Sequence, residues 1–290
     1  MPIDKTNLNF CKLAANLVQF QRRAMISIRK NELTVLQFAN LSRFPELCHF
    51  SSTRVGGCSS GNYNSLNLGF NSGDLPEMVN ANRLLLCAAL GIHPDPIVFP
   101  KQTHTDTIKM ITSDFFELGK GAQKQYLNET DAVVTDLKGV CVAIKTADCV
   151  PVLIFDPKRN VIAAVHAGWR GTVQSIAEKT IKLMVDKYGS EPLDLWAGIG
   201  PSISPEVYEV GEEVWKQFDP EFYLPTDPTK LDKRLLDLWH ANHHQLIVAG
   251  IPANQIEVAR TCTFSDPDRF FSARRDGIKT GRMATGIIMK

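Results

Sequence analysis

The chain has 290 residues, a hydrophobic fraction of 44%, a charged fraction of 22% and a formal net charge of +1. These values predict a globular protein with a sizeable core, and the near-zero charge argues against a nucleic-acid binder held by bulk phosphate neutralisation. No apolar run approaches the roughly 20 residues that a membrane-spanning helix needs, so no membrane partner is expected.

The cysteines and the N-terminus bear on the compartment. The seven cysteines are odd in number and widely scattered, which favours reduced thiols in a cytoplasmic compartment over a disulfide framework. Residues 1–24 carry four basic residues against the single acid Asp4, a balance that permits a mitochondrial presequence. We prefer the interpretation that 1–24 is an N-terminal extension created by an upstream start codon. This extension is expected either to be absent from the native protein or to be disordered. The domain then covers 25–290.

Strands and helices are intermixed along the chain. Short apolar or alternating runs predict strands, in chain order, at 26–30, 33–38, 49–52, 97–99, 131–135, 140–144, 150–155, 161–165, 195–199 and 283–289. Helical stripes and their end signals predict helices at 76–90, 173–188, 206–218 and 232–249. Residues 58–75, rich in Gly, Ser and Asn, predict an ordered loop. The expected fold class is α/β (mixed α+β), as a single compact domain.

The stretch 146–172 is the centre of the prediction. Its two apolar runs, Val150–Phe155 and Val161–Val165, are joined by a short turn containing Asp, Pro and Asn, which favours an antiparallel hairpin. The start of one antiparallel strand lies beside the end of the next. Cys149 comes just before the first strand and His166 just after the second, so the thiol and the imidazole are expected to meet.

His104, Cys149 and His166 each follow or precede a predicted strand. Two imidazoles and a thiolate match a catalytic zinc site, which has three protein ligands and an open fourth position. Their wide spacing is unlike that of a zinc finger and favours a site assembled by the fold. A second interpretation makes Cys149 a nucleophile and His166 its base, which leaves His104 without a role.

The segment His166–Thr172 passes from a strand end through two glycines into a helix. Such a junction offers backbone N–H groups and a helix dipole to an anion, and Arg170 could add a charge-assisted bond. Arg54 and Arg275 are further cations beside glycine turns that could recognise phosphate or ribose. The alternative interpretation is that the glycines only permit tight strand-to-helix packing and that the arginines are solvated charges.

Two acids stand near these residues. Asp148, next to Cys149, is expected to act as a general acid or base or to orient a ligand. The sequence leaves Asp131 open between such a role and a structural one. The histidines at 240, 243 and 244 share one face of a predicted helix without flanking acids, and we interpret them as an exposed face rather than a metal site.

With these residues in place, the chain resembles the laccase-domain or polyphenol oxidase family, which includes a related macrophage purine nucleoside enzyme. The resemblance runs from about residue 25 to the C-terminus and is carried by FSSTRVGGCS, YNSLNLGFNSGD, NR, KQTHTDTI, TADCVPVLIFDPKRNVIAAVHAGWRG, GPSISPEVYEVGEEV and FFSARRDGIKTGRMA. It implies layered sheets between helices. It also implies a zinc site at the positions of His104, Cys149 and His166.

The resemblance implies phosphorolysis of adenosine, inosine and methylthioadenosine to free base and ribose 1-phosphate, together with deamination of adenosine. The predicted protein is therefore a zinc enzyme of purine nucleosides and phosphate, monomeric or homodimeric. A copper-dependent phenol oxidase ranks second, because a multicopper laccase needs more imidazoles than the seven in this chain. The sequence is also compatible with a cysteine hydrolase of peptidoglycan precursors and with a zinc-stabilised binding module without turnover.

Overall fold

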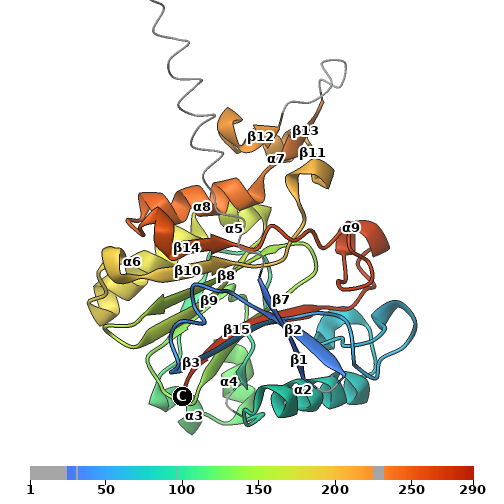
Figure 1. Cartoon of the computed structure of the whole chain (residues 1–290), viewed down its shortest axis with the longest axis vertical. Coiled ribbons are helices and arrows are strands. Elements are labelled where there is room, and N and C mark those ends of the chain that lie inside the picture. Colours follow the sequence, from blue (N-terminus) through green and yellow to red (C-terminus); the bar gives the residue numbers. More distant parts are fainter. Residues whose placement is uncertain (1–24, 31, 96, 225–231) are drawn as a thin grey trace, which may run out of the picture.

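The computed structural model describes residues 25–30, 32–95, 97–224 and 232–290 (Figure 1). The proposed extension 1–24 lies outside this part. The described residues form one mixed α/β domain built of three sheets with helices around them. None of the helices in the described part of the chain is both long and apolar enough to cross a membrane.

Two six-stranded sheets form the body of the domain. The first has the order β1 (Ile26–Lys30), β2 (Leu33–Gln37), β3 (Leu47–Ser52), β15 (Met283–Met289), β7 (Cys141–Thr146) and β4 (Ile97–Val98). The second has the order β14 (Ile256–Val258), β10 (Trp196–Ile199), β8 (Val150–Asp156), β9 (Val161–Ala167), β6 (Ala132–Thr135) and β5 (Ile108–Met110). Both sheets are mixed, since β4 pairs parallel with β7, and β5 with β6 and β14 with β10 are also parallel.

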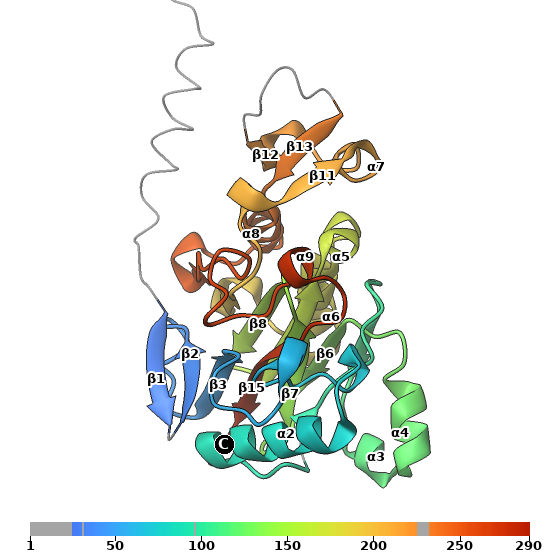
Figure 2. The ribbon, with the colours of Figure 1, turned by 90° about the vertical axis from the view of Figure 1, so that its right-hand side faces the viewer.

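The sheets and helices are stacked in layers (Figures 1 and 2). Buried residues such as Ile144, Leu153 and Ile287 fill the space between the two sheets. Helices α6 (Ile176–Tyr188) and α8 (Leu238–Val248) cover the outer face of the second sheet, while α2 (Pro76–Leu90) covers that of the first. The predicted class, with layered sheets flanked by helices, is confirmed.

The remaining elements are short. Helices α3 (Ser113–Glu117) and α4 (Lys120–Tyr126) follow β5, and α9 (Ala273–Asp276) precedes the last strand. A third, three-stranded sheet lies beyond α8 in Figure 2, with the order β11 (Glu209–Gly211), β13 (Lys233–Leu236) and β12 (Tyr223–Leu224).

The third sheet corrects two predicted helices. The helix expected at 206–218 is only α7 (Glu212–Trp215), because Glu209–Gly211 before it pairs as a strand with Lys233–Leu235. The helix expected from Asp232 begins at Leu238, where the Asp237 side chain accepts the N–H of His240 and caps it. In both segments, pairing with a strand that is distant in the sequence outweighed the local helical pattern.

The helix predicted at 173–188 is also divided. A short helix, α5 (Trp169–Val173), ends before α6 begins at Ile176. Ser175 between them has a left-handed backbone with φ 57°, which interrupts the helical hydrogen bonds. By contrast α2 begins at Pro76 and ends before Gly91, whose φ of 67° is the glycine stop that the sequence indicated.

Candidate metal centre

The site stands at the open end of the hairpin β8–β9. The two strands are antiparallel with Val150 opposite Ala167 and Pro151 opposite His166, so Cys149 lies just beyond the paired residues. At the other end, the Asp156 carboxylate accepts the backbone N–H groups of Lys158 and Arg159, which closes the turn. The predicted hairpin is confirmed, and its register places Cys149 and His166 side by side.

His104 completes the group from a loop between β4 and β5. One nitrogen of each imidazole and the Cys149 sulfur all lie within 4.8 Å of one another, in an arrangement that could hold a metal ion. The burial of the three is graded, since His166 is buried, Cys149 is half-buried and His104 is exposed. A metal held by these atoms would therefore have one side open to a substrate.

Asp131 joins the parts of this site. Its Oδ1 lies 2.7 Å from Nδ1 of His166 and accepts the backbone N–H of His104. Its Oδ2 accepts the backbone N–H groups of Thr103 and Thr105 and the Thr105 hydroxyl. The contact with Nδ1 leaves Nε2 of His166 to face the metal position. The sequence had left the role of Asp131 open, and the structure makes it the residue that orients His166.

Charges within the site reinforce one another. Burial by itself would raise the pKa of Asp131, but the hydrogen bond and charge of His166 and the amides of Thr105 and Thr103 lower it to about 2. Burial would also raise the pKa of the Cys149 thiol, but the charge of His166 and hydrogen bonds from His104 and His166 lower it to about 6. A thiolate, the form that binds metals, is thus favoured at neutral pH.

The backbone around the ligands is strained and tightly packed. His104 and Asp148 have φ values of 64° and 90°, a region that costs non-glycine residues about 1–3 kcal/mol. Gly168 follows β9 and makes room for the ligands. A Cβ there would lie 3.0 Å from the Cys149 sulfur and 3.1 Å from Cδ2 of His104. The sequence indicated this glycine only as part of an anion site, and its contact with two candidate metal ligands was missed.

Asp148 holds the segment before Cys149 in place. Its buried carboxylate accepts hydrogen bonds from the hydroxyls of Thr263 and Ser272 and from the backbone N–H of Arg274. These bonds tie the strained Asp148 to the loop before α9 and to the start of α9 itself. They favour a positioning role, the second of the two roles that the sequence suggested.

The three arginines singled out by sequence lie in different surroundings. Arg170 is exposed, and its guanidinium stacks 4.1 Å from the ring centroid of Trp169. Arg54 donates to the carbonyls of Asn64 and Pro267. Arg275 donates to the carbonyls of Thr263, Phe264 and Phe270 and to the Asp276 carboxylate. Arg54 and Arg275 therefore bridge loops, whereas Arg170 is the one turned to solvent.

The histidines at 240, 243 and 244 belong to α8 rather than to the site. The rings of His240 and His244 pack edge-on against Phe222 with centroids 5.2 Å and 5.6 Å away. His240 and His243 are half-buried, so the prediction of a wholly exposed face is wrong. Phe222, which directly precedes β12 of the third sheet, covers part of the His240 ring.

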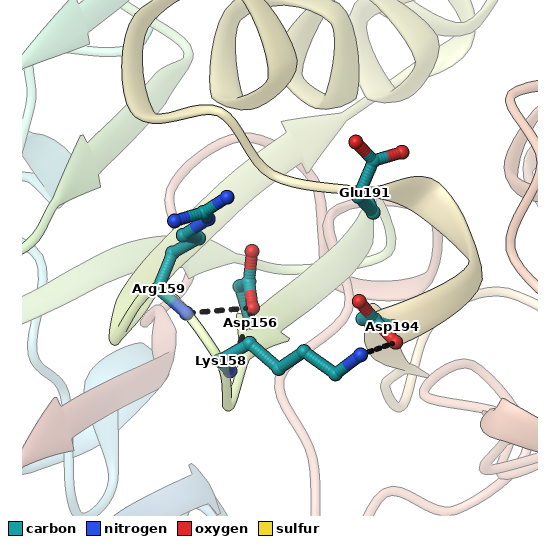
Figure 3. Close-up of a pocket in the computed structure, with 5 residues that line it drawn as sticks. All are labelled: Asp156, Lys158, Arg159, Glu191 and Asp194. Atoms are coloured by element: carbon teal, nitrogen blue, oxygen red, sulfur yellow. Dashed lines mark hydrogen bonds and ion pairs between the residues drawn. The ribbon is translucent and has the colours of Figure 1, made fainter.

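A separate pocket of about 290 Å³ lies at the turn end of the hairpin, lined by Asp156, Lys158, Arg159, Glu191 and Asp194 (Figure 3). Six residues of β8 stand between Cys149 and Asp156 of the pocket, a span of roughly 20 Å. Lys158 pairs with Asp194 at 2.9 Å across it. Its distance from the three candidate metal ligands excludes this pocket as part of their site.

Most of this chain matches known proteins. The family model described as multi-copper polyphenol oxidoreductase laccase matches residues 48–290. A purine nucleoside phosphorylase of Bacteroides thetaiotaomicron is 42% identical over 91% of this chain and 99% of its own length. A protein named adenosine deaminase RL5, from an unknown prokaryotic organism, is 36% identical over 89% of this chain and 99% of its own length.

Solved structures show the same fold. The crystal structure of YlmD from Geobacillus stearothermophilus has a TM-score of 0.82 and 32% identity, and the alignment covers 92% of this chain and 100% of that one. The resemblance drawn from the motifs is therefore confirmed by sequence and by structure. The chain belongs to the multi-copper polyphenol oxidoreductase laccase family.

Proposed function

We propose that the protein is a zinc-dependent purine nucleoside phosphorylase that also deaminates adenosine. The convergence of His104, Cys149 and His166, with Asp131 orienting His166, is the observation that carries this proposal. The names of the relatives, purine nucleoside phosphorylase and adenosine deaminase, support it. Two imidazoles and one thiolate with an open side suit a catalytic zinc ion, which would supply Lewis-acid activation of water when bound.

Phosphorolysis needs phosphate positioned against the anomeric carbon of the nucleoside. A phosphate oxygen forms the new bond to that carbon while the bond to the purine nitrogen breaks and its electron pair stays with the purine. The proton of hydrogen phosphate ends on the released base, so the products are free base and ribose 1-phosphate. In deamination, water supplies the oxygen that replaces the amino group, which leaves as ammonia.

The chain's own residues have distinct tasks in this proposal. Cys149 is held as a thiolate beside His166, and Asp148 holds the segment that presents it. Arg170 is exposed beside the hairpin and is the best placed of the three sequence-derived arginines for contact with a substrate. Arg54 and Arg275 are expected to shape the loops around that substrate through their carbonyl contacts.

The test is an incubation of the purified, metal-quantified protein with adenosine, with and without phosphate, followed by chromatography. We expect adenine only with phosphate and inosine without it. Cys149→Ala should lose both products, whereas Cys48→Ala, which removes a thiol from β3 outside the site, should keep both. Absence of any product while zinc is present at one per chain would refute the proposal.

A cysteine hydrolase is the second candidate. Burial by itself would lower the pKa of His166, but the charge of Cys149 and the hydrogen bond to Asp131 raise it to about 9, as in a thiolate–imidazolium pair. His104→Ala separates the two functions. It should abolish nucleoside turnover in the zinc enzyme, while a Cys149–His166 hydrolase would keep its activity.

A copper-dependent phenol oxidase is favoured only by the family description. In the described part of the chain, His104, Cys149 and His166 form the single group of three His, Cys, Asp or Glu side chains that could hold a metal. A multicopper oxidase requires several copper sites, so we rank this activity below the nucleoside reactions.

A further inference from the structure

Three cations from different elements lie between α2 and the first sheet. Arg83 on α2 stacks on Phe99, with its guanidinium carbon 4.2 Å from the ring centroid. Lys145 on β7 has its ammonium 5.1 Å from the centroid of the same ring. Arg282 directly precedes β15, in which Ala284 pairs with Lys145 across the two strands. We call Arg83, Lys145 and Arg282 the cation cluster.

Backbone carbonyls hold the cation cluster in place. Arg83 donates through Nε and Nη2 to the carbonyl of Leu68, and Lys145 donates to the carbonyl of Pro100 at 2.8 Å. Arg282 donates to the carbonyls of Thr280, Gly281 and, more weakly, Ile278. An ammonium has three N–H donors and a guanidinium five, so each cation keeps donors beyond these bonds.

The charges of the cation cluster are only partly offset by neighbouring acids. Within the described residues, no ion pair joins Arg83, Lys145 or Arg282 to an acid. Burial and then the charge of Arg83 lower the pKa of Lys145 to about 7, the charge of Asp131 opposes them, and the charge of Arg282 adds a smaller lowering. Half-buried charges are normally paired, and three like charges together are unfavourable until an anion joins them. All three residues keep part of their surface exposed to solvent.

The cation cluster adjoins the metal centre. The Gln102 side chain bonds both the backbone N–H and the carbonyl of Lys145, and Gln102 stands two residues before His104. Burial lowers the pKa of Arg282, while the charges of Cys149 and Asp148 raise it, which reflects their proximity. An anion on the cation cluster would therefore lie beside the substrate position at the metal centre.

We propose that Arg83, Lys145 and Arg282 form the binding site for inorganic phosphate, the co-substrate of the phosphorolysis proposed above, on which this inference rests. The cation cluster holds the phosphate oxygens by charge-assisted hydrogen bonds and leaves one oxygen to attack the anomeric carbon. Sequence reasoning had assigned phosphate to Arg54, Arg170 and Arg275. The structure instead groups Arg83, Lys145 and Arg282. Arg83 lies in the NR motif and Arg282 in the last motif that carries the family resemblance, whereas Lys145 lies in none of these motifs.

The test compares wild type with Lys145→Met and Arg83→Met, two substitutions that remove charge and keep an apolar stem. We expect the KM for phosphate to rise at least tenfold in each variant and the KM for the nucleoside to change less than twofold. Metal content should remain that of the wild type. Lys109→Met removes a lysine of β5 that contacts the ring of Tyr126 in the same cation–π manner, and it should leave both KM values unchanged.

A binding measurement tests the site without turnover. Inorganic phosphate should raise the Tm of wild-type protein, and this rise should be absent in Lys145→Met and present in Lys109→Met. Phosphorolysis with an unchanged KM for phosphate in Lys145→Met would overturn the site and leave the proposed function standing. Absence of phosphorolysis together with a phosphate-dependent Tm rise lost in Lys145→Met would refute the function and keep an anion site. Stabilisation by adenosine 5′-monophosphate but not by phosphate would overturn the assignment to inorganic phosphate.

Discussion

Asp131 contributes to the site through position rather than through contact with a substrate. Its carboxylate reaches His166 on one side and three backbone N–H groups of residues 103–105 on the other. The same acid therefore fixes the ring of one ligand and the loop that carries His104. A carboxylate that accepts the N–H of a metal-binding imidazole also raises the basicity of the ligand.

Asp131→Asn is expected to weaken zinc binding about 10–100-fold, since the amide keeps the shape of the carboxylate and loses its charge. Competition with a chelator of known affinity measures the change. Asp114→Asn, on the exposed face of α3, serves as the control and should bind zinc as the wild type does. Equal affinities for the two variants would show that the Asp131 contact does not tune the metal site.

The junction of β9 and α5 is the element on which the metal centre depends. The register of β9 opposite β8 is set by the short turn between them and by the full burial of both strands. A slip of one residue would turn every side chain of β9 to the other face of the sheet. Gly168 then allows the chain to leave the sheet directly beside Cys149 and His104. A glycine in a loop with open space around it would not indicate such a packing constraint.

Gly168→Ala should place a methyl group against two ligands and destabilise the fold by about 1–3 kcal/mol, the usual cost of overpacking. We also expect reduced zinc content after purification. Gly121→Ala in α4, where a Cβ meets nothing within 4 Å, should instead stabilise by about 0.5–1 kcal/mol. Denaturant unfolding and metal analysis report both effects, and an unperturbed Gly168→Ala protein would contradict the packing argument.

At the scale of the whole molecule, the metal centre and the cation cluster both depend on how the two large sheets are joined. β7 belongs to the first sheet and β8 to the second, and Asp148 and Cys149 stand in the short link between them. Lys145 near the end of β7 is therefore close to Cys149 in sequence and in space. Half-buried cations gathered here without a direct ion pair among the described residues should lower the free energy of unfolding, and stability measurements can detect this loss.

Lys145→Met should raise the Tm at pH 6 in phosphate-free buffer. The folded pKa of Lys145, about 7, lies below its unfolded value of 10.5, so the unfolded chain binds more protons between these limits. The stability of the wild type should accordingly increase as pH rises from about 7 to 10.5, and the variant should lack this contribution. A gain of about 1 kcal/mol corresponds to roughly 2–4 °C in a chain of this approximate size. A Tm at or below that of the wild type at pH 6 would show that Lys145 is not electrostatically strained.

The sequence by itself determined the α/β class, the central hairpin and the three candidate metal ligands. Strand periodicity and turn residues are local signals, and antiparallel pairing converts the spacing of Cys149 and His166 into contact. His104 was found because it follows a strand end in a recognisable motif. These inferences needed no knowledge of distant packing.

Only the tertiary structure decided the rest. Pairing of Glu209–Gly211 with Lys233–Leu235 replaced predicted helices by strands, because hydrogen bonds between distant segments outweigh a local helical pattern. The same holds for the roles of single residues. Asp131 became the orienting acid through its distance to His166, and Arg83, Lys145 and Arg282 became one cluster because α2, β7 and the start of β15 meet in space. Charge and burial depend on what surrounds a side chain, and the order of residues in the sequence does not contain that information.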